Sequence, residues 1–521
     1  MPSHRSSPPG NRPLTLPTGR RQFLRTAGYG TAAALALATL RPRLGAAEAL
    51  SGGLRSKDPS NDPLAMSATK LAELIRAKKI SATEAVKLHI ARIEQVNPKI
   101  NAIVTKCYER ALMEAAEADA LLAKGKLKGP LHGVPMTIKD SFDTAGILST
   151  GGTLGRKDFI PGKDATVVAR ARAAGAILLG KSNTPEFTLG GGGKGTINLV
   201  FGVTRNPYNL DYQPSGSSGG AGAIVACGGS SFDIGSDYGG SIRGPAFANG
   251  IAGIKPTLGR VPRTGHIVGY GGAFDSFQET GPLARRVEDL ALLLPILQGP
   301  DSWDAAMAPV PLGDPAAVNL GSLRIAFYTT NGQVDPTPEI QATVKQCVAY
   351  FSELGCKIAE DRPPKMKELA ETRNAFNGAD GREHIRRLLK KHGTLQASPG
   401  LRLDGEVVPA ERFTKLCEDM DAIRSEQLAW FEQYDLIVCP ASNCAPIPLD
   451  AERPKNWMGA SYTSEYNTTG WPAGVVRCGT AEKAPLPLGI QVVAQPWRDD
   501  VVIAALSHIE GKSGGWQKPP L

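Results

Sequence analysis

Two clusters of serine and glycine, together with one lysine upstream of them, are the residues of this chain that could perform nucleophilic chemistry. The clusters are Pro214-Ser-Gly-Ser-Ser-Gly-Gly220 and Gly235-Ser-Asp-Tyr-Gly-Gly-Ser-Ile-Arg243, and Lys139 follows an apolar run. A serine hydroxyl becomes a good nucleophile only when a base takes its proton, and a neutral lysine relayed through a second serine is such a base. Glycines let backbone N–H groups approach a developing negative charge closely. The set therefore predicts a serine nucleophile that works without histidine.

Strands and helices must hold these residues in place. The apolar run at 133–138 predicts a short buried strand that delivers Lys139. Residues 64–125 read as helical, with a capping box at Ser81-Ala-Thr-Glu84 and a helix end at Pro98. The next helix is expected to be capped by Asp164 and closed by Gly175.

The same alternation continues to the end of the chain. Further strands are expected at 176–179, 323–328, 435–439 and 488–493, and further helices near 286–297, 337–354, 366–391, 411–432 and 499–511. Strands alternating with helices favour an α/β fold, with a β-sheet covered by helices on both faces.

Two other motifs match known signatures but are better explained as structure. Gly175-Ala-Ile-Leu-Leu-Gly180-Lys181-Ser182 has the letters of a phosphate-binding P-loop, which is an exposed glycine-rich turn. Here the four middle residues are apolar, so Gly175 reads as a helix stop and Lys181 as the end of a strand. Ser67-Ala-Thr-Lys70 fits the S-x-x-K pattern of penicillin-recognising enzymes, but Ser67 is better explained as a helix N-cap.

The first 49 residues are expected to be a leader rather than part of the fold. Gly19-Arg-Arg-Gln-Phe-Leu-Arg25 carries paired arginines, and the alanine-rich apolar run Ala27–Leu40 follows it. This pattern is typical of a twin-arginine export signal and predicts a periplasmic or secreted protein. The leader has a net charge of +6 out of +9 for the whole chain. The remainder is nearly balanced, which gives no indication of nucleic-acid binding.

The cysteines and histidines do not suggest a metal or a cofactor. The eight cysteines form no C-x-x-C pair, and the seven histidines show no metal-binding spacing. We therefore expect no metal and no cofactor. Whether Cys439 and Cys444 pair after export is left open.

The clusters and their surroundings resemble the amidase signature family. The resemblance runs from Phe201-Gly-Val-Thr-Arg-Asn-Pro207 through both clusters to Gly253-Ile-Lys-Pro-Thr257 and Gly281-Pro-Leu-Ala-Arg285, and covers roughly 64–515. It implies a single large domain with a mixed β-sheet core. Ser461-Tyr-Thr463, Tyr466-Asn467 and Pro472-Ala-Gly-Val-Val476 give a narrower likeness to fatty-acid amide hydrolases and their bacterial relatives. The chain differs from these in its charged segment 385–412, and at its N-terminus we expect an export leader in place of a membrane helix.

The resemblance implies a role for each residue of the site. Ser241 would be the nucleophile, Ser217 the bridging serine behind a cis Gly216–Ser217 peptide, and Lys139 the base. The amides of Tyr238, Gly239, Gly240 and Ser241 would bind the oxyanion, and Asp237 and Arg243 would support the loop. Lowering the pKa of a lysine from about 10.4 to about 8 costs roughly 3 kcal/mol, which burial must impose. The structural alternative for Ser217 is the N-cap of a helix that follows it.

Together these observations predict an exported amidase that hydrolyses carboxylic amides to an acid plus an amine or ammonia through an acyl-enzyme. The expected layout is a signal peptide at 1–49, a linker at 50–63, the catalytic domain at 64–515 and a tail at 516–521. The partner would be a small-molecule amide, with no nucleic acid and no stable membrane anchor after signal removal; a homodimer is compatible with this. The alternatives are a non-catalytic binding protein on the same scaffold and an amidotransferase-type subunit.

Overall fold

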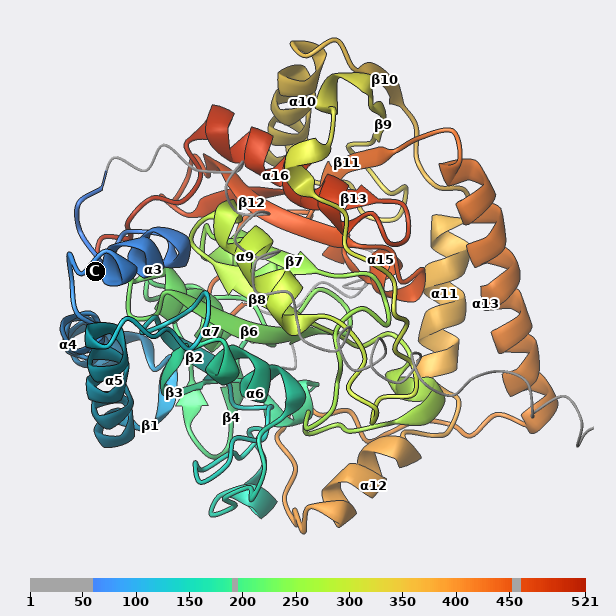
Figure 1. The fold of residues 1–521 in the computed structure, drawn as a ribbon. Helices are drawn as coiled ribbons and strands as arrows, with labels where there is room; N and C mark the ends of the chain where they lie inside the picture. The colour runs from blue at the N-terminus through green and yellow to red at the C-terminus, as the bar shows by residue number, and fades with distance from the viewer. Residues whose placement is uncertain (1–59, 190–194, 452–460) are drawn as a thin grey trace, which may run out of the picture. The chain divides into compact units, whose positions relative to one another are not determined.

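The computed structural model describes residues 60–189, 195–451 and 461–521 (Figure 1). All of them belong to one compact unit that ends at Leu521. The proposed leader at 1–49 and most of the proposed linker lie outside the described residues. No helix among the described residues is long and apolar enough to cross a membrane.

An eight-stranded mixed sheet forms the centre of this unit. Its order is β10-β9-β11-β13-β12-β7-β8-β6. The strands are β6 (Phe232–Asp237), β7 (Ala252–Lys255), β8 (Glu279–Ala284), β9 (Arg324–Phe327), β10 (Lys357–Glu360), β11 (Leu436–Pro440), β12 (Ala473–Thr480) and β13 (Pro487–Ala494). β9 pairs in parallel with β10 and β11, whereas the other pairs are antiparallel. The expected mixed sheet is confirmed.

A three-stranded sheet brings the lysine to the edge of the large sheet. It consists of β1 (Ile103–Lys106), β3 (Ile177–Ser182) and β2 (Pro135–Lys139), in that order. β2 lies beside β6 (Figure 1). Thr137 Oγ1 on β2 donates a hydrogen bond of 2.6 Å to Asp233 Oδ2 on β6. Lys139 ends β2, as the apolar run predicts, next to the end of β6. The short strands β4 (Ile197–Asn198) and β5 (Gly202–Val203) form a separate small hairpin.

Helices cover both faces of the sheet. One face packs against α6 (Thr166–Ala173), α9 (Val287–Leu297), α10 (Pro338–Ser352) and α16 (Asp499–Ser513). The apolar side chains of this group form one core. Separate apolar cores include side chains of α4 (Ala82–Ile100), α5 (Tyr108–Ala123), α7 (Gly219–Ala226), α8 (Arg243–Ala248) and α15 (Ser464–Thr468). Strand β11 shows why: Leu436 and Val438 join the first core, whereas Ile437 and Cys439 join another. Successive side chains of a strand point to opposite faces, so an unbroken apolar run is buried on both.

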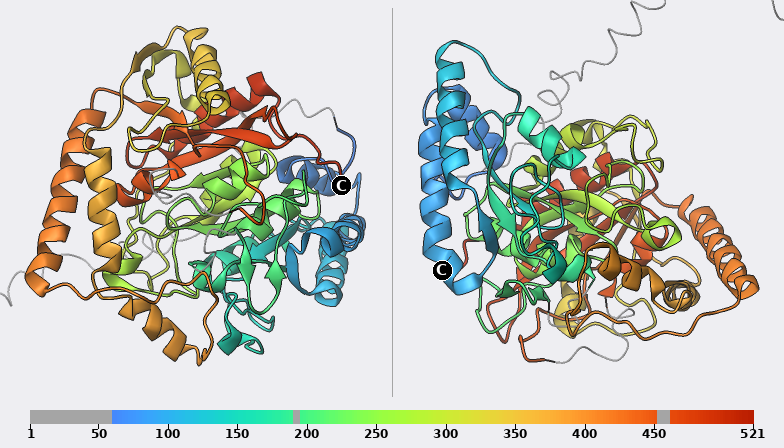
Figure 2. Two further views of the ribbon diagram at one scale, coloured as in Figure 1. Left: turned by 180° about the vertical axis from the view of Figure 1, so that it is seen from behind. Right: turned by 90° about the horizontal axis from the view of Figure 1, so that it is seen from below.

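The helix expected at 366–391 is two helices. They are α11 (Met366–Gly378) and α12 (Glu383–Lys391), separated by Gly381 and Arg382 with φ of 62° and 67°. Two successive left-handed residues cannot continue a right-handed helix. α11 lies beside α13 (Ala410–Phe431) in Figure 1 and in the left view of Figure 2.

Two further helix boundaries differ from the sequence expectation. Pro98 lies inside α4, which continues to Ile100. A proline in the last turn removes only one helical N–H bond, so the turn survives. Asp164 does not cap α6: its carboxylate accepts from the Ala145 amide at 2.7 Å and from Arg172 at 3.0 Å.

The region 64–125, expected to be helical, also contains the strand β1 between α4 and α5. The other helix-boundary predictions are confirmed. Ser67 caps α3 (Ala68–Arg76), the capping box at Ser81 is present, and Gly175 follows α6 with φ of 98°. Short 3₁₀ helices lie at Leu154–Arg156, Glu186–Thr188, Gly272–Asp275, Pro315–Ala317 and Leu320–Ser322.

The last six residues, expected as a tail, pack against the domain. The Trp516 indole N–H donates to the Ala226 carbonyl at 3.1 Å, and Arg92 donates to the Leu521 carbonyl at 2.7 Å. Residues 516–521 therefore pack against the domain that was expected to end at 515.

Candidate active site

Lys139 and Ser217 meet in the interior of the protein. Lys139 Nζ lies 2.7 Å from Ser217 Oγ, 2.9 Å from Ser236 Oγ and 3.4 Å from the Ser236 carbonyl oxygen. The lysine is fully buried and Ser217 is 4% exposed. The structure thus brings together two of the three residues that the resemblance assigns to catalysis.

The surroundings of Lys139 favour its neutral form. Burial lowers the pKa of its amine to about 7, although Asp237 and Asp233 act in the opposite direction. Removing an ammonium group from water disfavours the charged state, and no carboxylate of the described chain lies within ion-pair distance to offset this. A lysine with such a pKa can accept a proton near neutral pH.

Ser217 is not the N-cap of the helix that follows it, which was the structural alternative to its catalytic role. The N-cap of α7 is Ser218, and neither residue caps the helix with its side chain. The Gly216–Ser217 peptide is cis, as the resemblance implies. The Ser217 hydroxyl is therefore committed to Lys139 rather than to a helix end.

Ser241 lies on the neighbouring loop, next to the start of α7. The Ser218 amide donates to the Ser241 carbonyl at 3.1 Å, which ties the two serine–glycine loops together. Within the described part of the chain, no group is hydrogen bonded to the Ser241 hydroxyl. The contact between Ser217 and Ser241 that a proton relay needs stays a prediction.

The loop before Ser241 offers three of the four expected oxyanion amides. The Gly240 amide donates to Asp237 Oδ1 at 2.7 Å, so it is already engaged. The amides of Tyr238, Gly239 and Ser241 have no acceptor among the described residues. Gly240 has φ of 119°, and a Cβ there would lie 2.2 Å from Thr463 Oγ1, which explains why the position is glycine.

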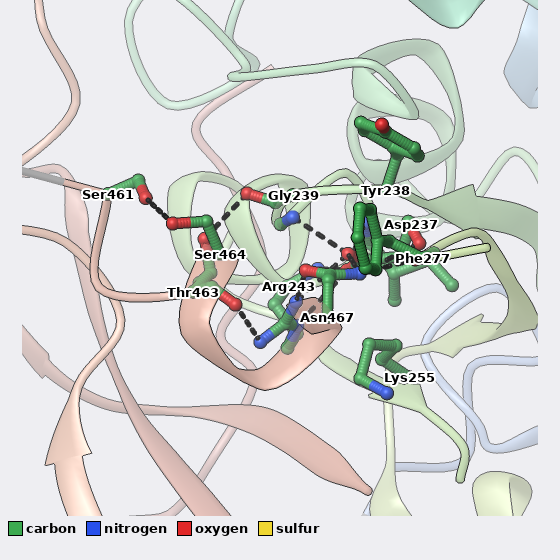
Figure 3. Close-up of polar contacts among 12 residues, drawn as sticks. Asp237, Tyr238, Gly239, Arg243, Lys255, Phe277, Ser461, Thr463, Ser464 and Asn467 are labelled. Atoms are coloured by element: carbon green, nitrogen blue, oxygen red, sulfur yellow. Dashed lines mark hydrogen bonds and ion pairs between the residues drawn. The ribbon is translucent and has the colours of Figure 1, made fainter. Parts of the chain in front are cut away.

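A buried ion pair holds this loop (Figure 3). Arg243 Nη2 lies 2.9 Å from Asp237 Oδ1, and its Nε lies 3.1 Å from Oδ2. Both side chains are fully buried. Asp237 Oδ2 also accepts from the amides of Ile242 and Arg243, at 3.0 and 3.3 Å. The pair thus has the supporting position expected for it, with the carboxylate inside the turn that carries Ser241.

Segments far away in the sequence complete this network (Figure 3). Arg243 donates to the Thr463 carbonyl at 2.9 Å, to Gln491 Oε1 at 2.8 Å and to Asn467 Oδ1 at 2.5 Å. Asn467 Nδ2 in turn donates to Asp237 Oδ1 at 2.9 Å. Burial by itself would raise the pKa of Asp237, but Arg243 and these hydrogen bonds hold that pKa well below its usual range.

A small cavity adjoins both serine–glycine loops. Its volume is about 140 Å³, and its walls come from those loops, from residues 441–447 and from Ser461 and Thr463. The wall includes Gly216 and Gly240, the residues that directly precede the two serines. No charged side chain is present among the described residues of the wall.

Sequence reasoning missed several residues of the site. Ser236 and His266 extend the contacts of Lys139, with His266 Nε2 at 3.1 Å from Ser236 Oγ. Arg373 of α11 donates to the carbonyl oxygens of Tyr238 and Ser464. Ser236 lies inside the second cluster and could have been suspected. His266 and Arg373 carry no local signal.

The P-loop-like motif does not join the site. Gly180–Ser182 belongs to strand β3, and Lys181 is buried with its amine 2.8 Å from Thr144 Oγ1 and 3.1 Å from Ser149 Oγ. A buried strand is not the exposed glycine turn that a phosphate needs. The interpretation of Lys181 as a structural strand residue is confirmed.

Comparison with known proteins agrees with this geometry. The sequence profile of the family described as Amidase matches residues 84–503. The chain belongs to the amidase signature family. It is therefore a hydrolase of amide C–N bonds, and the expected enzyme class and α/β fold are confirmed.

Relatives that are named for different activities are similar to the chain to similar degrees. Indoleacetamide hydrolase of Bradyrhizobium diazoefficiens is 32% identical over 473 residues, which cover 86% of each chain. A glutamyl-tRNA(Gln) amidotransferase subunit of Moorella thermoacetica is 33% identical over 477 residues, covering 85% of this chain and 96% of that protein. A solved fatty acid amide hydrolase superposes with a TM-score of 0.78 at 26% identity, covering 87% and 86%. Fatty-acid amide hydrolases are thus among the relatives, as the narrower likeness implies.

The buried pair gives a stability prediction. Asp237→Asn removes the charge that compensates Arg243 and leaves a buried cation unpaired, so the free energy of unfolding is expected to fall by about 3–5 kcal/mol. Denaturant titration measures this. Asp419→Asn, which breaks an exposed helical ion pair with Lys415, is the matched control and should change the midpoint little. Equal effects of the two substitutions would contradict the role of the pair.

Proposed function

We propose that this hydrolase cleaves amides through an acyl-enzyme on Ser241, with Ser217 as the proton relay and Lys139 as the base. The observation that carries the proposal is the 2.7 Å contact between Lys139 Nζ and Ser217 Oγ in a fully buried setting. A neutral amine at hydrogen-bond distance from a hydroxyl is positioned to take its proton. The adjoining loop presents Ser241 next to unengaged amides.

Each step moves one proton or one bond. Lys139 takes the proton of Ser217, and Ser217 takes the proton of Ser241 as Ser241 Oγ bonds to the amide carbon. The C–N bond breaks as Ser217 gives its proton to the leaving nitrogen and takes back the proton held by Lys139. Water then adds to the acyl-enzyme and releases the acid, which restores Ser241.

The oxyanion of this reaction would be held by the amides of Gly239 and Ser241, with Tyr238 beside them. Backbone donors that are already oriented stabilise the charge that develops on the carbonyl oxygen. Gly240 is left out of this set, because its amide is bonded to Asp237. The fixed turn therefore contributes donors without rearrangement during the reaction.

The cavity beside the serines supports a substrate with a small uncharged group next to the amide. A volume of about 140 Å³ is below the range of about 300–1,000 Å³ that is common for ligand pockets. The described wall contains Phe247, aliphatic side chains and the uncharged polar side chains of serine, threonine, asparagine, glutamine and cysteine, with no charge to pair with a carboxylate. Burial of an unpaired carboxylate is costly, so charged substrates are disfavoured.

Covalent labelling tests the nucleophile. A fluorophosphonate probe is expected to modify Ser241, and Ser241→Ala should lose both labelling and amide turnover, since Ser241 supplies the attacking hydroxyl. Ser322→Ala, at an exposed serine outside the site, is the control and should keep both. Ligand binding without turnover, unchanged in Ser241→Ala, would instead favour the non-catalytic binding protein.

The same assay separates hydrolase from amidotransferase. The one-third identity to an amidotransferase subunit supports this second candidate. We expect higher kcat/KM for neutral aryl and short aliphatic amides than for matched amides bearing a carboxylate, and no release of ammonia from glutamine by the isolated chain. Glutamine turnover that requires an added partner protein would favour the amidotransferase.

The pKa of Lys139 predicts the pH dependence. Its pKa is lowered from 10.5 to about 7, so the neutral base is present above about pH 7 and is lost as the pH falls through that value. With a substrate that does not titrate, kcat/KM should rise with pH through an acid limb near 7. A profile that stays flat down to about pH 5 would contradict a lysine base.

We also propose that residues 1–49 export the folded enzyme to the periplasm or beyond. The paired arginines before an apolar run support this. In a bacterial host with the twin-arginine pathway, Arg20→Lys combined with Arg21→Lys should retain the full-length chain in the cytoplasm. Arg41→Lys with Arg43→Lys is the matched control and should leave export intact. Fractionation and N-terminal sequencing read out both, and an uncleaved wild-type chain in the cytoplasm would refute export.

A further inference from the structure

A chain of polar contacts leads from Lys139 away from the two serines. Lys139 Nζ lies 2.9 Å from Ser236 Oγ, and Ser236 Oγ lies 3.1 Å from His266 Nε2. Gln278 Nε2 lies 3.3 Å from both ring nitrogens of His266 and, as a donor, can bond to whichever of them is unprotonated. Ser236, His266 and Gln278 are all buried, so these contacts are shielded from water.

The direction of each hydrogen bond decides whether Lys139 can act as a base. A neutral amine has two N–H donors and one lone pair. Two contacts of Lys139 can use the donors, those to Ser236 Oγ and to the Ser236 carbonyl. The lone pair is then left for the Ser217 hydroxyl at 2.7 Å. This arrangement requires Ser236 Oγ to accept from the lysine rather than donate to it.

Ser236 accepts from Lys139 without loss only if its own proton has another acceptor. We propose that His266 is a positioning residue: its unprotonated Nε2 accepts the Ser236 hydroxyl proton, and this turns the lone pair of Lys139 toward Ser217. The inference rests on the catalytic roles proposed above and adds a residue to them. His266 touches neither substrate nor the reacting serines in this role; it acts through Ser236.

The environment of His266 suits a neutral ring in a fixed orientation. The ring packs edge-on against Phe142, with centroids 5.1 Å apart, and the Ile267 amide bonds to the Ser141 carbonyl at 2.8 Å. Burial, with repulsion from Lys139, Arg263 and Arg156, holds the pKa of His266 well below its usual range. The charged groups that face Lys139 itself are Asp233 and Asp237 of β6. The ring therefore stays neutral over the working pH range.

The opposite tautomer would reverse the outcome. With a proton on Nε2, His266 would donate to Ser236 Oγ, and the Ser236 hydroxyl would have only the lysine lone pair as an acceptor at this contact. Lys139 would then offer Ser217 a donor instead of a lone pair. The tautomer of one buried imidazole thus decides whether the relay starts in the productive direction.

Nitrogen NMR of the protein labelled with ¹⁵N-histidine tests the direction of the bond. We expect His266 to show a protonated Nδ1 and a bare Nε2, assigned by the signals that disappear in His266→Leu. A protonated Nε2 would overturn the proposal. Because this measurement needs no substrate, it stands even if the proposed amidase reaction is not observed.

A double-mutant cycle tests whether His266 acts through Ser236. His266→Leu and Ser236→Ala are each expected to lower kcat about tenfold with little change in KM. A tenfold loss in rate corresponds to the free energy of about one hydrogen bond. The double variant should be no slower than either single variant, because the two residues act in series. His266→Gln, which retains an acceptor oxygen, should restore part of the rate.

The pH profile and a matched histidine separate this role from a structural one. In His266→Leu, Ser236 has lost its acceptor and can donate to the lone pair of Lys139. This bond favours the neutral amine, so the acid limb of the kcat/KM profile should move to lower pH, while the plateau rate falls. His89 is the control: it is fully buried with Nε2 3.3 Å from the Ser231 hydroxyl, and His89→Leu should leave kcat and the limb unchanged in the folded protein. The proposal would be overturned if the losses in kcat were additive in the double-mutant cycle and the acid limb of the pH profile did not move. If the fluorophosphonate probe did not label the wild type, the amidase mechanism would be refuted instead.

Discussion

Burial of a single amine is the constraint around which this site is arranged. Lys139 ends a strand whose other residues are also buried, and it makes no ion pair within the described chain. An ammonium group in that position would lose its hydration, so the amine is held near its neutral form. The cost is met by the packing of two sheets and the helices around them. The lowered pKa of Lys139 is therefore set by the packing of the whole core rather than by one neighbouring group.

The loop that carries Ser241 depends on a second buried group of opposite character. Asp237 and Arg243 neutralise each other and bind several further groups between them, from the Gly240 amide to Gln491 on β13. Breaking one partner leaves an uncompensated charge, so the turn has little freedom to rearrange. A rigid turn holds the amides of Gly239 and Ser241 in fixed orientations. That fits a reaction in which charge develops on a carbonyl oxygen.

The sequence predicted what is local and missed what is assembled from a distance. The strand ending at Lys139, the capping box at Ser81 and the serine–glycine loops each follow from a few adjacent residues. The break between α11 and α12 escaped because Arg382 adopts a left-handed conformation that its residue type does not announce. His266 contacts Ser236 only through the folding of β2, β6 and the loop before β8. No spacing in a single sequence encodes such a contact.

Two buried aspartates near the lysine would be expected to hold it in its charged form, and the structure deals with each of them differently. Arg243 compensates part of the charge of Asp237 and so weakens its attraction for a proton on Lys139. Asp233 has no such partner within the described chain, and burial raises its pKa to about 7, so it loses its proton over the same pH range in which the lysine becomes neutral. Both aspartates therefore attract a proton to Lys139, and burial of the amine outweighs that attraction. Arg243 therefore supports the base as well as the loop, although it touches neither Lys139 nor Ser217.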